Sequence, residues 1–204
     1  KKILYIEHPY SFNSLGDEKS INQIEHNDIL NEFKSFTKRN KYLLTNSSKY
    51  SFLNIQDTKA NVFDNLNKIQ SNINIKNKKN YIEYYLNTKQ LIIIIGSQTC
   101  PYNHNDSLSL RILESYLSYG MSSILFKVFR ENNGLTYEAG VFYPSRKFNA
   151  PFSIYLSVSE RNASLTLNLL LTIWDDLLSK KISKNDLSIA KLKLYSSFLH
   201  KYRT

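Results

Sequence analysis

Residues 129–143 read FRENNGLTYEAGVFY and place Arg130 and Tyr137 on either side of Asn-Asn-Gly. An arginine offers planar, permanently charged donors to a carbonyl or carboxylate oxygen. A tyrosine offers a phenolic donor to an oxyanion that develops during hydrolysis. The same stretch also fits a structural role, in which Arg130 favours a helix C-terminus, Gly134 ends the helix and Tyr137 enters a strand. Spacing alone favours the structural role.

The other reactive residues form no recognisable catalytic or metal-binding pattern. The histidines His8, His26, His104 and His200 lie far apart, without the i, i+4 spacing of a helical zinc site. The lone Cys100 excludes an intrachain disulfide and a cysteine-cluster metal site, and it fits a reducing compartment. The sequence therefore predicts neither a complete active site nor any metal ligand within these residues.

Composition indicates a folded chain and argues against membrane and nucleic-acid partners. The 204 residues are 42% hydrophobic and 13% aromatic, which is ample for a packed core. We identify no secretory signal and no apolar run long enough to span a bilayer, so we expect no membrane partner. The net charge of +10 invites a nucleic-acid interpretation, but the basic residues are scattered and mostly lysine. A solvated basic surface is the preferred interpretation, with no nucleic-acid partner.

The chain divides by composition into three parts. Residues 1–45 include a helical pattern over 21–33, residues 46–79 are rich in Asn, Ser and Lys and predict a linker, and residues 80–204 form a second unit. The sequence starts at Lys1 without an initiator methionine, within what reads as a continuing segment, and it stops at Thr204 inside a predicted helix. We interpret it as a fragment of a longer protein.

The second unit alternates strands and helices in a definite order. Residues 81–86 and 90–95 predict one long strand or two short ones, with LIIIIG buried on both faces. A helix over 107–119 and another from Ser122 to Gly134 follow, and then strands 136–143 and 151–159 predict an antiparallel hairpin. Helices opening at Asn162, with Leu165 on an apolar face, and at Ser183 complete the pattern. This order predicts an α+β fold, an antiparallel sheet with helices packed on one face.

The stretch GMSSILFKVFRENNGLTYEAGVFY resembles a signature of the pitrilysin/insulysin (inverzincin) zinc metallopeptidases, which include the mitochondrial processing peptidases. The matching residues are Gly120, Met121, Ser122, Ser123, Leu125, Phe126, Arg130, Glu131, Gly134, Leu135 and Tyr137. The resemblance covers roughly residues 8–36 and 88–200. Tyr119, Ile124 and the Asn132-Asn133 pair depart from residues common in the family.

The resemblance implies which half of such a peptidase this chain represents. Members bind zinc through H-x-x-E-H and a later glutamate in the first half, so zinc would belong to the full-length protein or to a partner subunit. Residues 1–45 would close the preceding peptidase-like domain, and 80–204 would form the second, substrate-contacting domain. Arg130 and Tyr137 would be the catalytic and substrate-binding residues, reaching towards the peptide.

The resemblance leaves two functions open. The chain would be the C-terminal portion of a zinc metalloendopeptidase, contributing substrate and transition-state contacts to peptide hydrolysis. Alternatively, it would be a non-catalytic homologue that binds or assembles with a catalytic peptidase partner, since the family includes subunits without the zinc motif. The expected partners are a peptide substrate and either the N-terminal half of the same chain or a homologous subunit.

Overall fold

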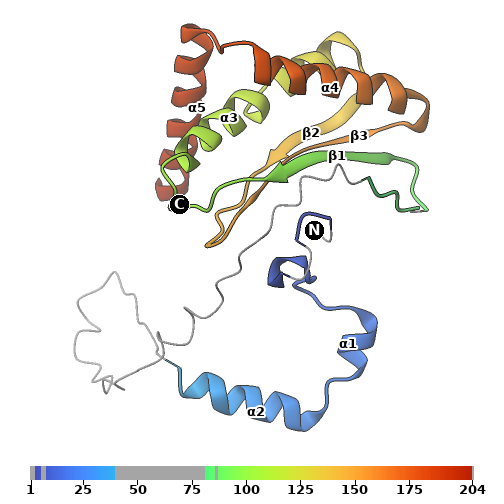
Figure 1. The fold of residues 1–204 in the computed structure, drawn as a ribbon, viewed down its shortest axis with the longest axis vertical. Helices are drawn as coiled ribbons and strands as arrows, with labels where there is room; N and C mark the ends of the chain where they lie inside the picture. The colour runs from blue at the N-terminus through green and yellow to red at the C-terminus, as the bar shows by residue number, and fades with distance from the viewer. Residues whose placement is uncertain (1–2, 6–7, 40–80, 86, 204) are drawn as a thin grey trace. The chain divides into compact units, whose positions relative to one another are not determined.

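A computed structural model describes residues 3–5, 8–39, 81–85 and 87–203. The chain divides into two compact units, Lys1–Lys79 and Asn80–Thr204 (Figure 1). The linker predicted over residues 46–79 lies outside the described residues. The division into the end of one peptidase-like domain, a linker and a second domain stays a prediction.

The first unit contains short capped helices. The 3-10 helix η1 spans Pro9–Ser11, and the helices α1 and α2 span Glu18–Asn22 and His26–Thr37. A capping box pairs Asp17 with Ser20 at the start of α1, which satisfies backbone N–H groups that the helix leaves unpaired. The helical pattern predicted over 21–33 is thus confirmed as two helices, with its isoleucines exposed.

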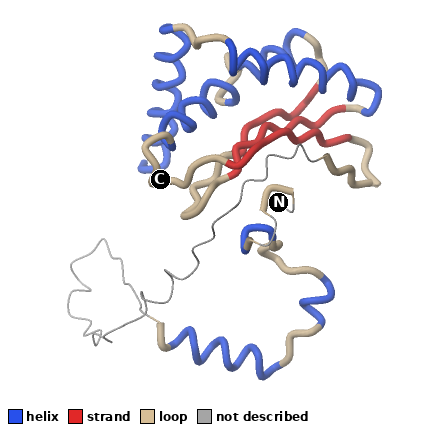
Figure 2. Tube along the Cα trace, in the orientation of Figure 1, coloured by secondary structure: helices blue, strands red, loops and turns tan. Residues whose placement is uncertain are grey.

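The second unit has two layers, a three-stranded sheet and a layer of helices on one of its faces (Figures 1 and 2). The strands β1, β2 and β3 pair antiparallel in the order β1-β3-β2. This arrangement confirms the predicted α+β class. The elements follow one another as β1 Leu91–Gln98, α3 Ser107–Ser118, η4 Phe126–Asn132, β2 Thr136–Phe142, β3 Pro151–Val158, η5 Glu160–Asn162, α4 Ala163–Ser179 and α5 Lys184–Arg203.

The central strand β3 supplies much of the hydrophobic core. Successive side chains of a strand point to opposite faces, and every second residue of β3 is a buried hydrophobic one. They pack with Leu125 and Phe129 from the segment after α3 and with Leu170 of α4. The core residues of β3 are Phe152, Ile154, Leu156 and Val158.

The strand β1 departs from its predicted environment. Ile93 and Ile95 pack against the core, but Ile92 and Ile94 are 59% and 65% exposed, so the expectation of burial on both faces is wrong. The alternating pattern arises because helices cover only one face of the sheet. The predicted strand at 81–86 is also wrong, because residues 81–85 form no strand.

The ends of the helices agree with the prediction more closely than the set of side chains that each helix buries. The helix after α3 begins at Ile124, so Ser122 is not its cap, whereas Gly120 and Gly134 have the expected positive φ angles. In α4, Leu165 is half exposed and Leu170 is fully buried in its place. The predicted cap of α5 is confirmed, since the Ser183 hydroxyl accepts from the backbone N–H of Asp186.

Arg111 of α3 holds the connection between β2 and β3 against the helix layer. Its guanidinium donates to the Tyr143 carbonyl oxygen and to the Ser145 hydroxyl at 2.8 Å, and it forms an ion pair with Glu114 at 3.0 Å. The guanidinium carbon lies 4.5 Å from the centroid of the Tyr143 ring. Burial first, then the neighbouring Cys100, raise the pKa of Tyr143 to about 12.

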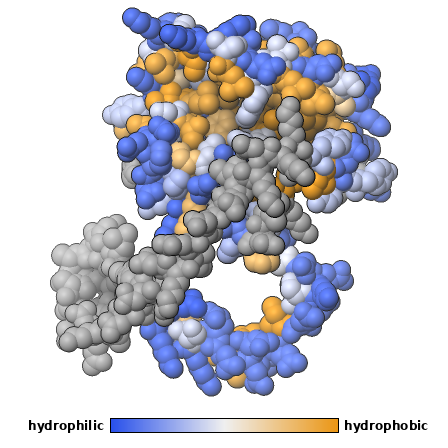
Figure 3. Space-filling view, viewed as in Figure 1, coloured by the Kyte–Doolittle hydropathy of each residue, from blue (hydrophilic) through white to orange (hydrophobic). Residues whose placement is uncertain are grey.

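Apolar side chains also reach the surface of the second unit, as Figure 3 shows for the face drawn. They include Ile92 and Ile94 of β1, Phe142 of β2, and Leu167 and Leu171 of α4. Within the described residues, none of the helices combines the length and hydropathy that crossing a bilayer requires.

The close pairing of β1 with β3 predicts that Gly96→Ala destabilises the sheet. A Cβ at Gly96 would lie 2.7 Å from the Phe152 carbonyl oxygen and 2.8 Å from the Ser153 Cα, so backbone would have to move. We expect a loss of about 1–3 kcal/mol in the free energy of unfolding, measured by denaturant titration. The exposed neighbour Ser97 is the matched control, and Ser97→Ala should change stability by less than about 0.5 kcal/mol. Equal stability of the two variants would contradict this pairing of β1 with β3.

The environment of Tyr143 predicts a specific alkaline dependence. Because the pKa is raised on folding, the neutral phenol stabilises the fold below pH 10, and this contribution is lost as pH rises towards about 12. An absorbance titration should show one phenol ionising near pH 12, and Tyr143→Phe should remove that step. A Tyr143→Phe titration identical to that of the parent protein would refute the assignment.

Candidate functional site

The helical segment that carries Arg130 ends in an unusual way. Residues 126–132, the element η4, form a π-helix, whose wider turns alter the spacing of its side chains. The chain then reverses at Gly134, which has a φ of 57° that side-chain-bearing residues rarely adopt. The Gly134 N–H donates to the Arg130 carbonyl at 3.1 Å, and the Leu135 N–H donates to the Phe129 carbonyl at 2.7 Å. These bonds fix Arg130 at the last turn of the helix.

The strand that follows begins with a β-bulge at Tyr137. Thr136 pairs with Val158 and Glu138 with Ser157, so two residues of β2 advance the register by one on β3. The extra residue, Tyr137, is left outside the ladder and is 80% exposed. Bulges are a common means of redirecting one side chain at a functional edge.

A buried hydroxyl holds this bulge together. The Thr136 Oγ1 lies 2.7 Å from the Glu138 carbonyl oxygen and 2.6 Å from the Ser157 carbonyl oxygen, so its proton can serve either acceptor. Thr136 is buried and cannot readily exchange these contacts for water. The orientation of Tyr137 therefore depends on the hydrogen bonds of the Thr136 hydroxyl.

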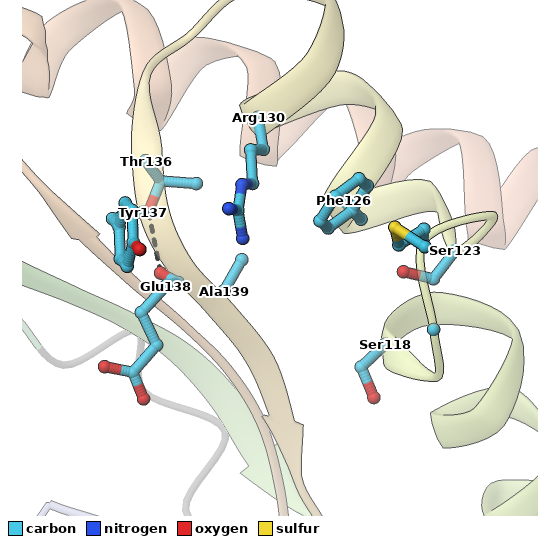
Figure 4. Close-up of a pocket in the computed structure, with 10 residues that line it drawn as sticks. Ser118, Ser123, Phe126, Arg130, Thr136, Tyr137, Glu138 and Ala139 are labelled. Carbon is cyan, nitrogen blue, oxygen red and sulfur yellow. Dashed lines mark hydrogen bonds between the residues drawn. The ribbon is translucent and has the colours of Figure 1, made fainter.

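The two irregular segments place Arg130 between two aromatic rings. The guanidinium carbon lies 4.8 Å from the centroid of the Tyr137 ring and 5.0 Å from that of the Phe126 ring. Figure 4 shows Arg130 between Tyr137 and Phe126, with Phe126 one helical turn before it. Such cation–π contacts contribute about 0.5–2 kcal/mol each and restrict a flexible side chain.

These residues line a pocket of about 270 Å³. Ser123 forms part of its wall, and the Ser123 hydroxyl is fully buried without a hydrogen-bond partner among the described residues. The lining is mixed in character, with apolar, polar and charged members. It consists of Ser118, Gly120, Met121, Ser123, Phe126, Arg130, Thr136, Tyr137, Glu138 and Ala139.

The Arg130 guanidinium has no hydrogen bond or ion pair within the part of the chain that the structure describes. Glu138 lines the same pocket, but Figure 4 shows its carboxylate directed away from Arg130. Arg130 is exposed, and a guanidinium carries five N–H donors and no acceptor. The pocket thus presents a cation whose donors are available to a ligand.

The structure brings Arg130 and Tyr137 together as one site, while their catalytic role stays a prediction. Across residues 3–5, 8–39, 81–85 and 87–203, no three His, Cys, Asp or Glu side chains are grouped so as to hold a metal ion. Sequence reasoning missed the roles of Phe126 and Thr136. The i, i+4 spacing from Phe126 to Arg130 was a signal for the first, whereas only the register of the sheet reveals the second.

Comparison with known protein families identifies the class of this domain. The model of the peptidase M16 inactive domain matches residues 66–194, and the chain belongs to this family, the pitrilysin-type peptidases, as a C-terminal domain. No curated protein matches the chain.

Two solved structures share the fold. One is a peptidase M16 inactive domain from Pseudomonas fluorescens, with 22% identity and a TM-score of 0.51 over 54% of this chain and 27% of that one. The other is a protease from Helicobacter pylori, with 16% identity and a TM-score of 0.53 over 57% of this chain and 29% of that one. This chain thus spans less than a third of each structure.

The bulge predicts that Thr136→Val destabilises the domain while Thr136→Ser does not. Valine keeps the shape but removes the hydroxyl, leaving the Glu138 and Ser157 carbonyl oxygens without that donor. We expect a loss of about 1–2 kcal/mol in unfolding free energy for Thr136→Val. The amide resonance of Tyr137 should shift in the same variant. Equal stability of the valine and serine variants would show that the hydroxyl does not hold the bulge.

Proposed function

We propose that this chain is the substrate-contacting C-terminal portion of a pitrilysin-type zinc metalloendopeptidase. The observation that carries the proposal is the shared pocket, in which Arg130 has unpaired donors and Tyr137 stands beside it. Membership of the peptidase M16 family supports the assignment to a peptidase-type protein.

Arg130 and Tyr137 would act on the bound peptide through hydrogen bonds. The guanidinium would bind a peptide carbonyl and fix the position of the chain. The phenol would donate to the oxygen that gains negative charge during hydrolysis, a contribution that grows as the charge develops. Both donors are preorganised, because Gly134 and the bulge determine where their backbones lie.

The metal would come from elsewhere in the complete protein or from a partner subunit. The described residues do not fit a zinc site, as they offer no group of three ligands. Zinc, when bound by another domain, would activate the attacking water. The role proposed for this chain is limited to holding the peptide and stabilising charge.

The alternative is a non-catalytic homologue that binds or assembles with a catalytic peptidase. The description of the matched family as an inactive domain favours this possibility. The same pocket would then bind a peptide without contributing to its cleavage. Zinc content separates the two, since a full-length catalytic chain should bind zinc itself and an assembly subunit should not.

Substituting the two donors tests the catalytic proposal. In the full-length protein, with any partner subunit present, Arg130→Ala and Tyr137→Phe should each lower kcat/KM on unstructured peptides by about 100-fold. Tyr137→Phe should act mainly on kcat, because its donor is used as the oxyanion forms.

Lys181→Ala is the matched control, because it removes an exposed cation outside the pocket. This variant should hydrolyse peptides at the parental rate. Unchanged turnover in both Arg130→Ala and Tyr137→Phe, with normal folding, would eliminate the catalytic role. No turnover by the parent full-length chain alone, together with peptide binding that Arg130→Ala abolishes, would favour the binding subunit.

A further inference from the structure

The two rings beside Arg130 restrict how a ligand can approach it. Phe126 lies on one side of Arg130 and Tyr137 on the other (Figure 4), with their ring centroids 5.0 Å and 4.8 Å from the guanidinium carbon. The edge of the group, where its N–H donors lie, has no partner among the described residues. Because the N–H donors of a guanidinium lie in its plane, a ligand that hydrogen-bonds to Arg130 binds edge-on.

Edge-on binding favours a planar, two-oxygen anion. A carboxylate presents two oxygens at the spacing of the guanidinium fork and forms two parallel, charge-assisted hydrogen bonds. A peptide carbonyl offers one oxygen and no net charge, so it cannot accept two parallel, charge-assisted hydrogen bonds from the guanidinium.

The charges around the pocket are compatible with such a ligand. Among the described residues of the lining, Glu138 is the one acidic side chain, and its carboxylate is directed away from Arg130 (Figure 4). The whole chain carries a net charge of +10, which attracts acidic peptides over a longer range. Glu138 would still repel an anion weakly. Replacing it with glutamine should therefore tighten the binding of an anion, whereas replacing Arg130 should weaken it.

Phe126 acts here as a positioning residue. Its ring covers one face of Arg130 and is itself half-buried, so it gives a mobile side chain a fixed support. The π-helix of η4 determines the offset between the two residues. Removing the ring would leave the charge in place but free the guanidinium to move.

We infer that the pocket is a carboxylate-binding subsite, which holds an acidic side chain or the free C-terminal carboxylate of a peptide edge-on against Arg130, with Phe126 positioning the guanidinium. This inference rests on the proposed function, because it assumes that the ligand is a peptide. It adds the chemical class of the peptide group that the site selects.

Matched peptides test the selectivity in the full-length protein. The probe is an unstructured peptide of Ala and Ser in three forms, with one Glu and an amidated end, with Gln and an amidated end, and with Gln and a free carboxylate. We expect at least one carboxylate form to bind about 10-fold more tightly than the Gln amide form in a calorimetric titration. The form that binds tightly identifies the source of the carboxylate.

Variants assign the selectivity to named groups. Arg130→Lys keeps the charge but not the planar fork, so it should abolish most of the preference of about 10-fold. Phe126→Leu should weaken the preference and remove the ring-current shift of the Arg130 side-chain resonances, and Phe126→Tyr should restore both. Glu138→Gln should tighten binding of the carboxylate form, whereas Lys181→Ala should leave the preference between the peptides unchanged.

The outcomes separate this inference from the proposed function. Equal binding of all three peptides, combined with a loss of binding in Arg130→Ala, would overturn carboxylate selection and leave peptide contact intact. Binding and turnover that do not depend on Arg130 at all would overturn both. A preference that survives Phe126→Leu with an unshifted Arg130 resonance would remove Phe126 from the site.

Discussion

The central strand β3 is the constraint on which the second unit depends. Both β1 and β2 pair with β3 and not with each other. The positions of β1 and β2 in the sheet therefore follow from their pairing registers with β3. The same strand presents Ile154 and Leu156 to the core, which couples sheet formation to core packing. Since β3 carries the hydrogen bonds of one layer and the hydrophobic contacts between layers, a shift of one residue would expose its buried face.

The pocket arises from two departures from regular geometry that lie next to each other. The π-helix η4 brings Phe126 and Arg130 together, and the bulge in β2 turns Tyr137 out of the ladder. Each irregularity is stabilised locally, the helix end by Gly134 and the bulge by the Thr136 hydroxyl. Irregular backbone of this kind persists where surrounding contacts determine it, and it is commonly found at functional sites.

Membership of the M16 inactive-domain family gives these features a coherent setting. In a peptidase, cations and hydrogen-bond donors directed at the substrate can contribute to hydrolysis from a different domain than the one that holds the metal. Arg130 is exposed, and its donors form no hydrogen bond or ion pair among the described residues, so they remain accessible to a ligand. The rings of Phe126 and Tyr137 beside it restrict where its guanidinium lies.

The Arg130 and Tyr137 pair was singled out by the family resemblance, since spacing alone favoured a structural role for both residues. The sequence by itself determined the order of most strands and helices, the antiparallel hairpin, and the turns at Gly120 and Gly134. These follow from periodicity, glycine conformation and local spacing, which are properties of neighbouring residues. Only the tertiary structure decided that Ile92 and Ile94 are exposed, that Tyr137 lies in a bulge and that Phe126 stacks on Arg130. Each of these three features depends on which segment, distant in the sequence, packs against the residue. The pattern of neighbouring residues does not identify that segment.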